Sequence, residues 1–295
     1  MEKSFEKSHP FVVATYFVCS TVLVMLLNHP LFLLLAILLV IANAKLFVAT
    51  STVWKTLKGS LLLIVLVMLI NMLFNKNGTT EIFVLLGQSI TLEALVYSVA
   101  MGGMLLAIFQ LSLLFNATLN GAKFLFIVSK LAPKLGLVTM LALRYVPLLK
   151  MHLQQITSVQ RLKGHSLTEG SFIERIKSGI LLLQQLLSIS LEDALQTADS
   201  MKARGYQLRV KRTSFTHYEW HRHDTLALLF LATVFIAACV GAATGLDIIT
   251  IYSTLHVSWA TEQLIVSAVA GGLLAFPLIL QSLEWCKWKY YAWKM

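Results

Sequence analysis

The residues of this chain best suited to binding chemistry lie in two short segments. Each segment ends with a cation that is followed by a glycine. They occupy residues 160–164 (Gln-Arg-Leu-Lys-Gly) and 201–205 (Met-Lys-Ala-Arg-Gly), and their glycines are 41 residues apart. The residues that matter are Arg161, Lys163 and Gly164 in the first, and Ala203, Arg204 and Gly205 in the second. A cation in the last turn of a helix interacts well with the helix dipole, and a following glycine ends the helix at little cost. The chemistry predicted is therefore binding by cations at two helix ends.

Helical periodicity leads into both sequences. Apolar residues recur every three or four positions across 187–201, with polar residues on the other face, which is typical of an amphipathic helix. Leu149, Leu153, Ile156 and Val159 form a shorter stripe of the same kind. Ser171 and Glu174 have capping-box spacing before a further apolar run, so a helix is expected to begin there. The sequence thus predicts a module of three amphipathic helices.

The composition of the whole chain indicates a polytopic membrane protein. Hydrophobic residues make up 57% of the 295 residues, charged residues only 13%, and the mean hydropathy is +0.76. A soluble domain does not need so apolar a composition. The net charge of +10 comes mainly from cations in the polar segment and near the C-terminus, which is typical of cytoplasmic loops. Nucleic-acid binding is therefore disfavoured, and the three separated cysteines form no metal or redox motif.

Long apolar runs predict an all-α membrane fold with about six spans and both termini in the cytoplasm. The runs lie at residues 11–27, 31–48, 60–74, 98–119, 225–246 and 263–283. Residues 81–119 are long enough for two short spans or for one. We favour one, because Lys123 and Lys130 then lie on the same side as Lys55 and Lys58. Residues 135–149 are apolar but short and contain Arg144 and Pro147, so an interfacial helix is expected there rather than a span.

These runs divide the chain into three parts. Residues 1–134 form an N-terminal transmembrane region with about four spans, and residues 135–223 form a cytoplasmic module of coupling helices. Residues 224–295 form a C-terminal pair of spans with a basic and aromatic tail. The module, with its excess of Lys and Arg, is expected on the cytoplasmic side of the membrane.

Residues for catalysis, metal binding or ATP binding are not evident in the sequence. The polar residues within apolar runs, such as Glu93 and Gln110, do not pair with a His or Ser as a nucleophile and its base would. His221, His223 and Asp224 lie beside Trp220 where the chain enters the membrane, so we interpret them as interface residues rather than metal ligands. No phosphate-binding loop of the Walker type is present. We expect no catalytic residues, no metal and no cofactor.

The residues around the two cationic ends resemble a known family. The module is similar to the transmembrane coupling subunit, or T component, of energy-coupling factor transporters, which are ABC importers of vitamins and metal ions. In that family two Ala-Arg-Gly motifs end coupling helices and dock in grooves of ATPase subunits. Ala203, Arg204 and Gly205 match the second motif. The first departs from the pattern, because Leu162 and Lys163 stand where Ala and Arg are expected, and a lysine loses the forked geometry of arginine.

The resemblance implies a non-catalytic subunit of a multi-pass cell-membrane transporter. It would bind two cytoplasmic ATPase subunits, which hold the ATP, and a small substrate-binding membrane subunit. The cargo would be a vitamin, a related micronutrient or a metal ion. Two alternatives stay open: a permease subunit of a conventional ABC importer, and an ion-coupled carrier or membrane-embedded enzyme. The paired helix ends argue against the first, and the lack of paired intramembrane charges argues against the second.

Overall fold

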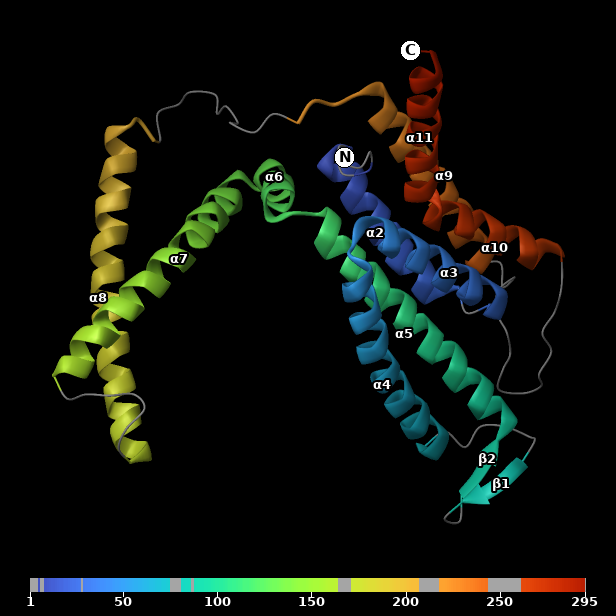
Figure 1. The fold of residues 1–295 in the computed structure, drawn as a ribbon, viewed down its shortest axis with the longest axis horizontal. Coiled ribbons are helices and arrows are strands. Elements are labelled where there is room, and N and C mark those ends of the chain that lie inside the picture. The colour runs from blue at the N-terminus through green and yellow to red at the C-terminus, as the bar shows by residue number, and fades with distance from the viewer. Residues whose placement is uncertain are drawn as a thin grey trace. The chain divides into compact units, whose positions relative to one another are not determined.

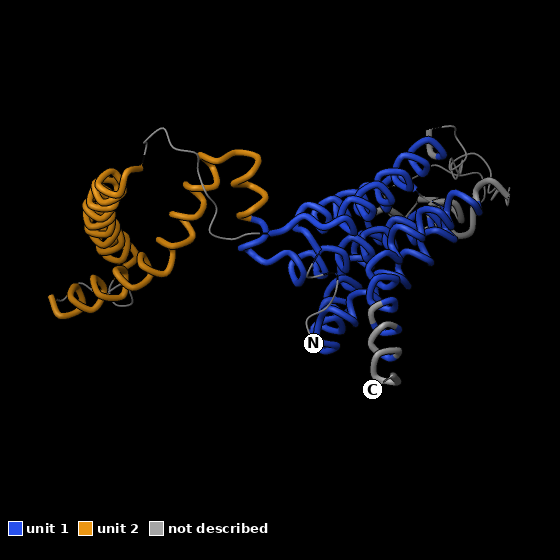
Figure 2. The backbone as a smooth tube through the Cα atoms, turned by 90° about the horizontal axis from the view of Figure 1, so that it is seen from above, with its two compact units in different colours: residues 1–124, 218–295 blue, residues 125–217 orange. Residues whose placement is uncertain are grey.

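A computed structural model describes residue 5 and residues 8–27, 29–74, 81–85, 88–163, 171–206, 218–243 and 261–294. Within these ranges the chain forms helices and one small hairpin (Figure 1). The chain divides into two compact units, with residues 1–124 and 218–295 in unit 1 and residues 125–217 in unit 2 (Figure 2). The predicted all-α membrane fold is confirmed. The assignment of residues 135–223 to the cytoplasmic side stays a prediction.

Unit 1 is a bundle of apolar helices. They are α2 (Pro10–Leu26), α3 (Pro30–Phe47), α4 (Thr50–Phe74), α5 (Leu92–Thr118), α9 (Arg222–Ala243), α10 (Thr261–Leu274) and α11 (Phe276–Lys294). Helix α5 packs against α2, α3 and α4, while α9 packs against α2 and α10. The side chains of Tyr16, Phe32 and Leu273 are fully buried between these helices, where close packing and polar contacts, rather than burial from water, hold membrane helices together.

The predicted spans correspond to helices of unit 1. Among the described residues, α3, α4, α5 and α9 contain segments that are long and apolar enough to cross a membrane, and α10 with α11 forms a fifth span if the bent pair counts as one. The sixth predicted span coincides with α2, an apolar helix of 17 residues that is slightly shorter than the others. Residues 81–119 supply a single span, in α5, as predicted. Before it, strand β1 (Glu81–Leu85) pairs antiparallel with β2 (Gln88–Thr91).

The bend between α10 and α11 is stabilised by polar side chains from two other helices. The pair bends by 55°, next to Pro277, which cannot donate a backbone hydrogen bond to Leu273. At the same bend, the neighbouring Leu274 carbonyl accepts from two side chains. The Tyr16 hydroxyl donates to it at 3.2 Å, and the Asn43 amide donates at 2.9 Å. Within an apolar bundle an unpaired carbonyl is costly, so these two donors fix the bend at one place.

One carboxylate ties together the beginnings of α2 and α9. Asp224 accepts hydrogen bonds from the backbone N–H of His9 at 3.1 Å and of His221 at 3.0 Å. A carboxylate is favourable at the N-terminal end of a helix because it accepts from amides that have no partner in the helix. The two predicted spans therefore begin side by side, as they must if both enter the membrane from the same face.

Unit 2 contains α7 (Pro133–Leu162) and α8 (Phe172–Ala203), preceded by the second half of α6 (Gly121–Leu131). The prediction of three amphipathic helices was wrong, because the structure has two long ones. The expected interfacial helix at 135–149 and the stripe at 149–159 form one helix despite Pro147. The helix that starts at Ser171 runs on to Ala203, since the residues from 180 to 200 contain neither Gly nor Pro and keep one apolar spacing. The predicted capping box of Ser171 and Glu174 is present.

Candidate functional site

The second cationic end is a complete helix-terminating motif. Helix α8 ends at Ala203, and Arg204 follows as its C-cap. The N–H of Gly205 donates to the carbonyl of Lys202 at 3.0 Å, and the N–H of Tyr206 donates to the carbonyl of Met201 at 3.0 Å. This pair of bonds is the Schellman motif, which requires a left-handed residue just after the cap. Gly205 has the required φ of 84°.

The motif fixes the position of Arg204 through backbone hydrogen bonds, and the Arg204 side chain takes no part in them. The hydrogen bonds that end α8 are made by backbone groups. The cap therefore does not depend on the guanidinium group. Arg204 is exposed, and within the described ranges it forms no ion pair. A cation held at a fixed helix end, with its donors unused, is suited to binding an external acceptor.

We expect Gly205→Ala to destabilise unit 2, because any L-residue is strained at a φ of 84°. The cost should be about 1 kcal/mol, seen as a lower midpoint when the purified chain is unfolded in detergent. Gly59→Ala is the matched control. Gly59 lies inside α4 with open space around the added methyl, so that variant should be neutral or more stable by about 0.5 to 1 kcal/mol. Equal effects of the two changes would contradict the role assigned to Gly205.

The first cationic end has the same general form. Helix α7 ends at Leu162, Lys163 is its C-cap, and Arg161 lies in the last turn. The Lys163 N–H donates to the carbonyls of Val159 and Gln160. Lys163 and Arg161 are exposed and form no ion pair with any described residue. Gly164, the predicted partner of Lys163, lies outside the described residues.

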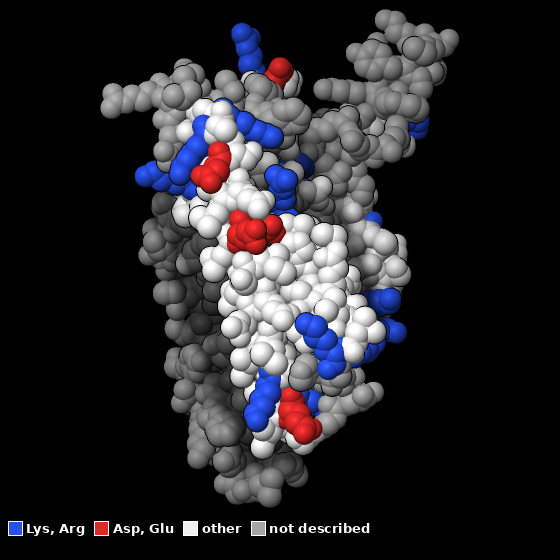
Figure 3. Space-filling view, turned by 90° about the vertical axis from the view of Figure 1, so that its left-hand side faces the viewer, with Lys and Arg blue, Asp and Glu red and all other residues white. Residues whose placement is uncertain are grey.

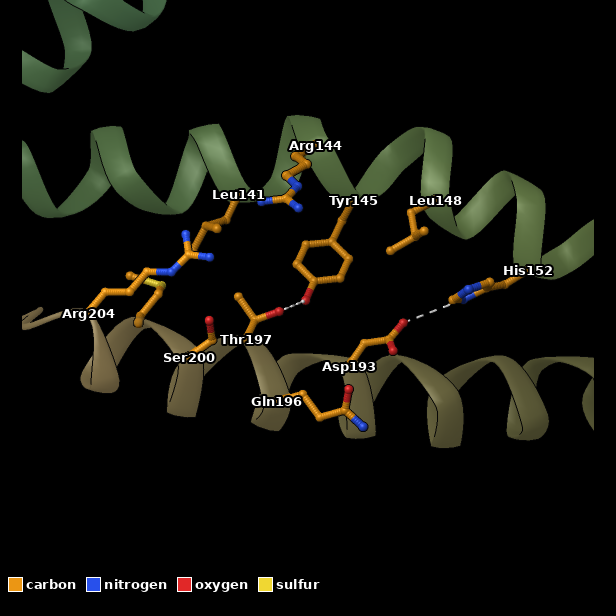
Figure 4. Close-up of a pocket in the computed structure, with 11 residues that line it drawn as sticks. Leu141, Arg144, Tyr145, Leu148, His152, Asp193, Gln196, Thr197, Ser200 and Arg204 are labelled. Carbon is orange, nitrogen blue, oxygen red and sulfur yellow. Dashed lines mark hydrogen bonds and ion pairs between the residues drawn. The ribbon is translucent and has the colours of Figure 1, made fainter. Parts of the chain in front are cut away.

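Helices α7 and α8 run antiparallel (Figure 4), and among the described residues two side-chain hydrogen bonds and one longer His–Asp contact join them. The hydroxyl groups of Tyr145 and Thr197 are 2.9 Å apart, and the Gln160 amide donates to Gln185 at 3.0 Å. His152 Nδ1 lies 3.7 Å from a carboxylate oxygen of Asp193. These contacts set the register of the pair, so each cationic end is held beside a particular part of the other helix.

Sequence reasoning missed the contacts between the helices. Leu141, Tyr145, Leu148 and His152 recur at spacings of four, three and four, which places them on one helix face. That spacing could have indicated a face of alternating apolar and polar side chains turned toward a partner helix. It could not have identified Asp193 and Thr197 as the partners, because the register of two helices depends on packing that a single sequence does not show.

Exposed apolar side chains form a long stripe on α8. Its members are Ile173, Ile176, Ile180, Leu183, Leu187, Leu191 and Leu195. Their spacing of three or four places them on one face, and they are 46–68% exposed. A space-filling view shows a broad surface without charged side chains, with acidic and basic side chains at its upper and lower ends (Figure 3). A soluble surface rarely leaves so long a stripe uncovered, so it marks contact with a protein or a membrane.

Comparison with known proteins identifies the family. Residues 2–215 match the family model of CbiQ, described as cobalt transport protein. That match covers well over half of the chain. The chain belongs to the CbiQ family. This membership confirms the resemblance to T components of energy-coupling factor transporters that the residues around Arg204 suggested.

Curated relatives of this CbiQ-family chain carry the name energy-coupling factor transporter transmembrane protein EcfT. The chain is 34% identical to the protein from Staphylococcus aureus over 103 residues, which are 35% of this chain and 38% of the relative. It is 36% identical to the protein from Macrococcus caseolyticus over 101 residues, which are 34% of this chain and 38% of the relative. It is 30% identical to the protein from Thermotoga maritima over 112 residues, which are 38% of this chain and 41% of the relative. The aligned part thus spans about two-fifths of these relatives.

Proposed function

We propose that this multi-pass membrane protein is the transmembrane coupling subunit of an energy-coupling factor importer. It transmits ATP-driven motion of two cytoplasmic ATPase subunits to a small substrate-binding membrane subunit. The observation that carries the proposal is the α8 end, where a Schellman motif holds Arg204 exposed and without an ion pair among the described residues. The family match and the EcfT names of the relatives support the same role.

The ATPases are proposed to bind the two cationic ends of unit 2. Arg204 inserts into a groove of one ATPase subunit and Lys163 into the other, with Arg161, Ala203 and the two glycines shaping the ends. ATP itself is bound by the ATPases, and this chain contributes no catalytic residue. Arginine is the stronger of the two cations for this purpose, because its planar fork makes paired hydrogen bonds while an ammonium group makes single ones.

The α8 stripe is proposed as the surface that meets the substrate-binding membrane subunit. That subunit is itself embedded in the bilayer and so presents apolar surface, which matches the seven exposed Ile and Leu side chains of α8. Unit 2 then contacts both kinds of partner, with cations at the helix ends and apolar side chains along the helix. A rigid helix pair that touches both is what mechanical coupling requires.

The cargo is proposed to be a vitamin, a related micronutrient or a metal ion, taken up across the cell membrane. The family description as a cobalt transport protein favours a metal ion among these. Both termini and the module of residues 135–223 are proposed to lie in the cytoplasm, and the shared beginning of α2 and α9 at Asp224 supports one side for the two segments that precede these helices. Substrate choice would belong to the membrane subunit rather than to this chain.

Copurification from the native host tests the proposal. The tagged chain should retain two ATPase subunits and one small membrane protein, and the purified assembly should hydrolyse ATP. The control is another polytopic membrane protein of that host with the same tag. Recovery of the chain without any ATPase, under conditions in which other ABC transporters of the host stay intact, would refute the proposed role.

A further inference from the structure

A polar cavity lies between α7 and α8, next to the end that carries Arg204. Its volume is about 400 Å³. Residues from both helices line it, and five of the eleven are polar residues of α8 or its cap: Asp193, Gln196, Thr197, Ser200 and Arg204. The cavity therefore differs in its chemistry from the exposed apolar stripe of α8.

Two arginines from different helices face this one cavity. Arg144 extends into it from α7, and Arg204 extends from the end of α8, with both guanidinium groups at the same end of the cavity (Figure 4). Both side chains are exposed, and neither forms an ion pair with a described residue. Like charges that share a cavity repel each other, and the attraction of both cations to an anion bound between them would outweigh that repulsion.

The acidic residue that lines the cavity does not neutralise the arginines. Asp193 lies beside His152 at 3.7 Å, and Figure 4 places this pair at the opposite end from Arg144 and Arg204. Between the ends, the Tyr145 and Thr197 hydroxyls bond to each other at 2.9 Å. The end near the two arginines is thus left with an excess of positive charge and with Ser200 as a nearby hydroxyl donor.

We propose that Arg144 and Arg204 together form a binding site for one carboxylate, supplied by an Asp or Glu side chain of an ATPase subunit. The inference rests on the proposed function, because it gives the chemistry by which that partner is recognised at the α8 end. A carboxylate has two oxygens and can accept from both guanidinium groups at once. Arg144 belongs to α7 and Arg204 to the end of α8, so one partner side chain would clamp the two helices together.

A double-mutant cycle on the reconstituted complex tests the site. ATPase subunits that copurify with the chain are titrated onto wild-type chain in nanodiscs, and onto Arg144→Ala, Arg204→Ala and the double variant. Each single change should weaken ATPase binding about tenfold or more. The double variant should be weaker than the singles by only a few-fold, because both arginines act on the same carboxylate. Arg175→Ala, an exposed arginine near the start of α8, is the control and should bind as wild type.

Further readouts separate binding from folding. Arg144→Lys keeps the charge and should recover part of the affinity, and Arg144→Ala should reduce the dependence of ATPase binding on salt. If Arg144→Ala binds ATPases normally while Arg204→Ala does not, the shared site is wrong and the coupling role stands. Fully additive losses would also overturn the shared carboxylate. If neither single change weakens binding, the proposed function itself fails at this helix end.

Discussion

Arg204→Glu is expected to release an ATPase subunit from the complex while the chain itself stays folded. The change removes the guanidinium donors and places a negative charge against the ATPase carboxylate that we propose as the partner of Arg204. Loss of one member of a desolvated charge pair at an interface costs about 2 to 5 kcal/mol. Substrate uptake should fall to background, because a transporter that has lost an ATPase cannot complete its cycle.

The same change should cost the fold little. Arg204 forms no ion pair with a described residue, and the Schellman bonds of Gly205 and Tyr206 come from the backbone. What is lost is the interaction of a cation with the helix dipole, about 0.3 to 1 kcal/mol. Membrane insertion and expression should therefore be near normal, which separates an assembly defect from a folding defect.

The measurement is ATPase retention and substrate uptake at matched expression. Arg175→Glu is the control, since it reverses an exposed arginine of the same helix near its other end. Lys163→Glu should be milder than Arg204→Glu, because a lysine makes no forked contact to lose. Full substrate uptake by the Arg204→Glu variant would mean that both cationic ends are ordinary helix caps.

The sequence predicted most of the local structure around Arg204. The periodicity across residues 187–201 and the glycine after Arg204 reflect backbone and helix-face chemistry, which acts over a few residues. The positions of the spans were likewise predictable from length and hydropathy, and they correspond to helices of unit 1. The continuity of α8 was missed although the sequence carries it: residues 180–200 contain no Gly or Pro and keep one apolar spacing, and residues 172–203 form one helix where two were predicted.

What could not be predicted depends on pairs of residues that are distant in the chain. Tyr16 and Asn43 meet the Leu274 carbonyl across more than 230 residues. Arg144 and Arg204 meet at one cavity because the register of α7 on α8 places them there. Both arrangements are set by how the helices pack. A single sequence shows the type of each residue, but it does not show which distant residue packs against it. The roles of the cationic ends remain predictions that the variants above will test.

Leu187→Asp is expected to remove the substrate-binding membrane subunit and leave the ATPases bound. Leu187 lies in the middle of the α8 stripe and is 62% exposed in the chain alone. If a partner covers it, its burial contributes about 1.5 to 3 kcal/mol. A carboxylate in that contact loses this contribution and must also shed its water, so the loss of affinity should exceed about 100-fold. Most of the Leu187 side chain is exposed, so the variant should disturb the packing of unit 2 little.

Ser188→Asp provides the matched control, because it adds the same side chain one residue along. That position is exposed and is turned by about 100° around the helix from Leu187. Both variants are purified from the host at equal expression, and the retained ATPases and membrane subunit are quantified. With Leu187→Asp the ATPases should remain at wild-type levels, because Lys163 and Arg204 are untouched. Retention of the membrane subunit by Leu187→Asp would mean that this subunit does not cover the stripe, since a subunit docked there could not tolerate a buried carboxylate at its centre.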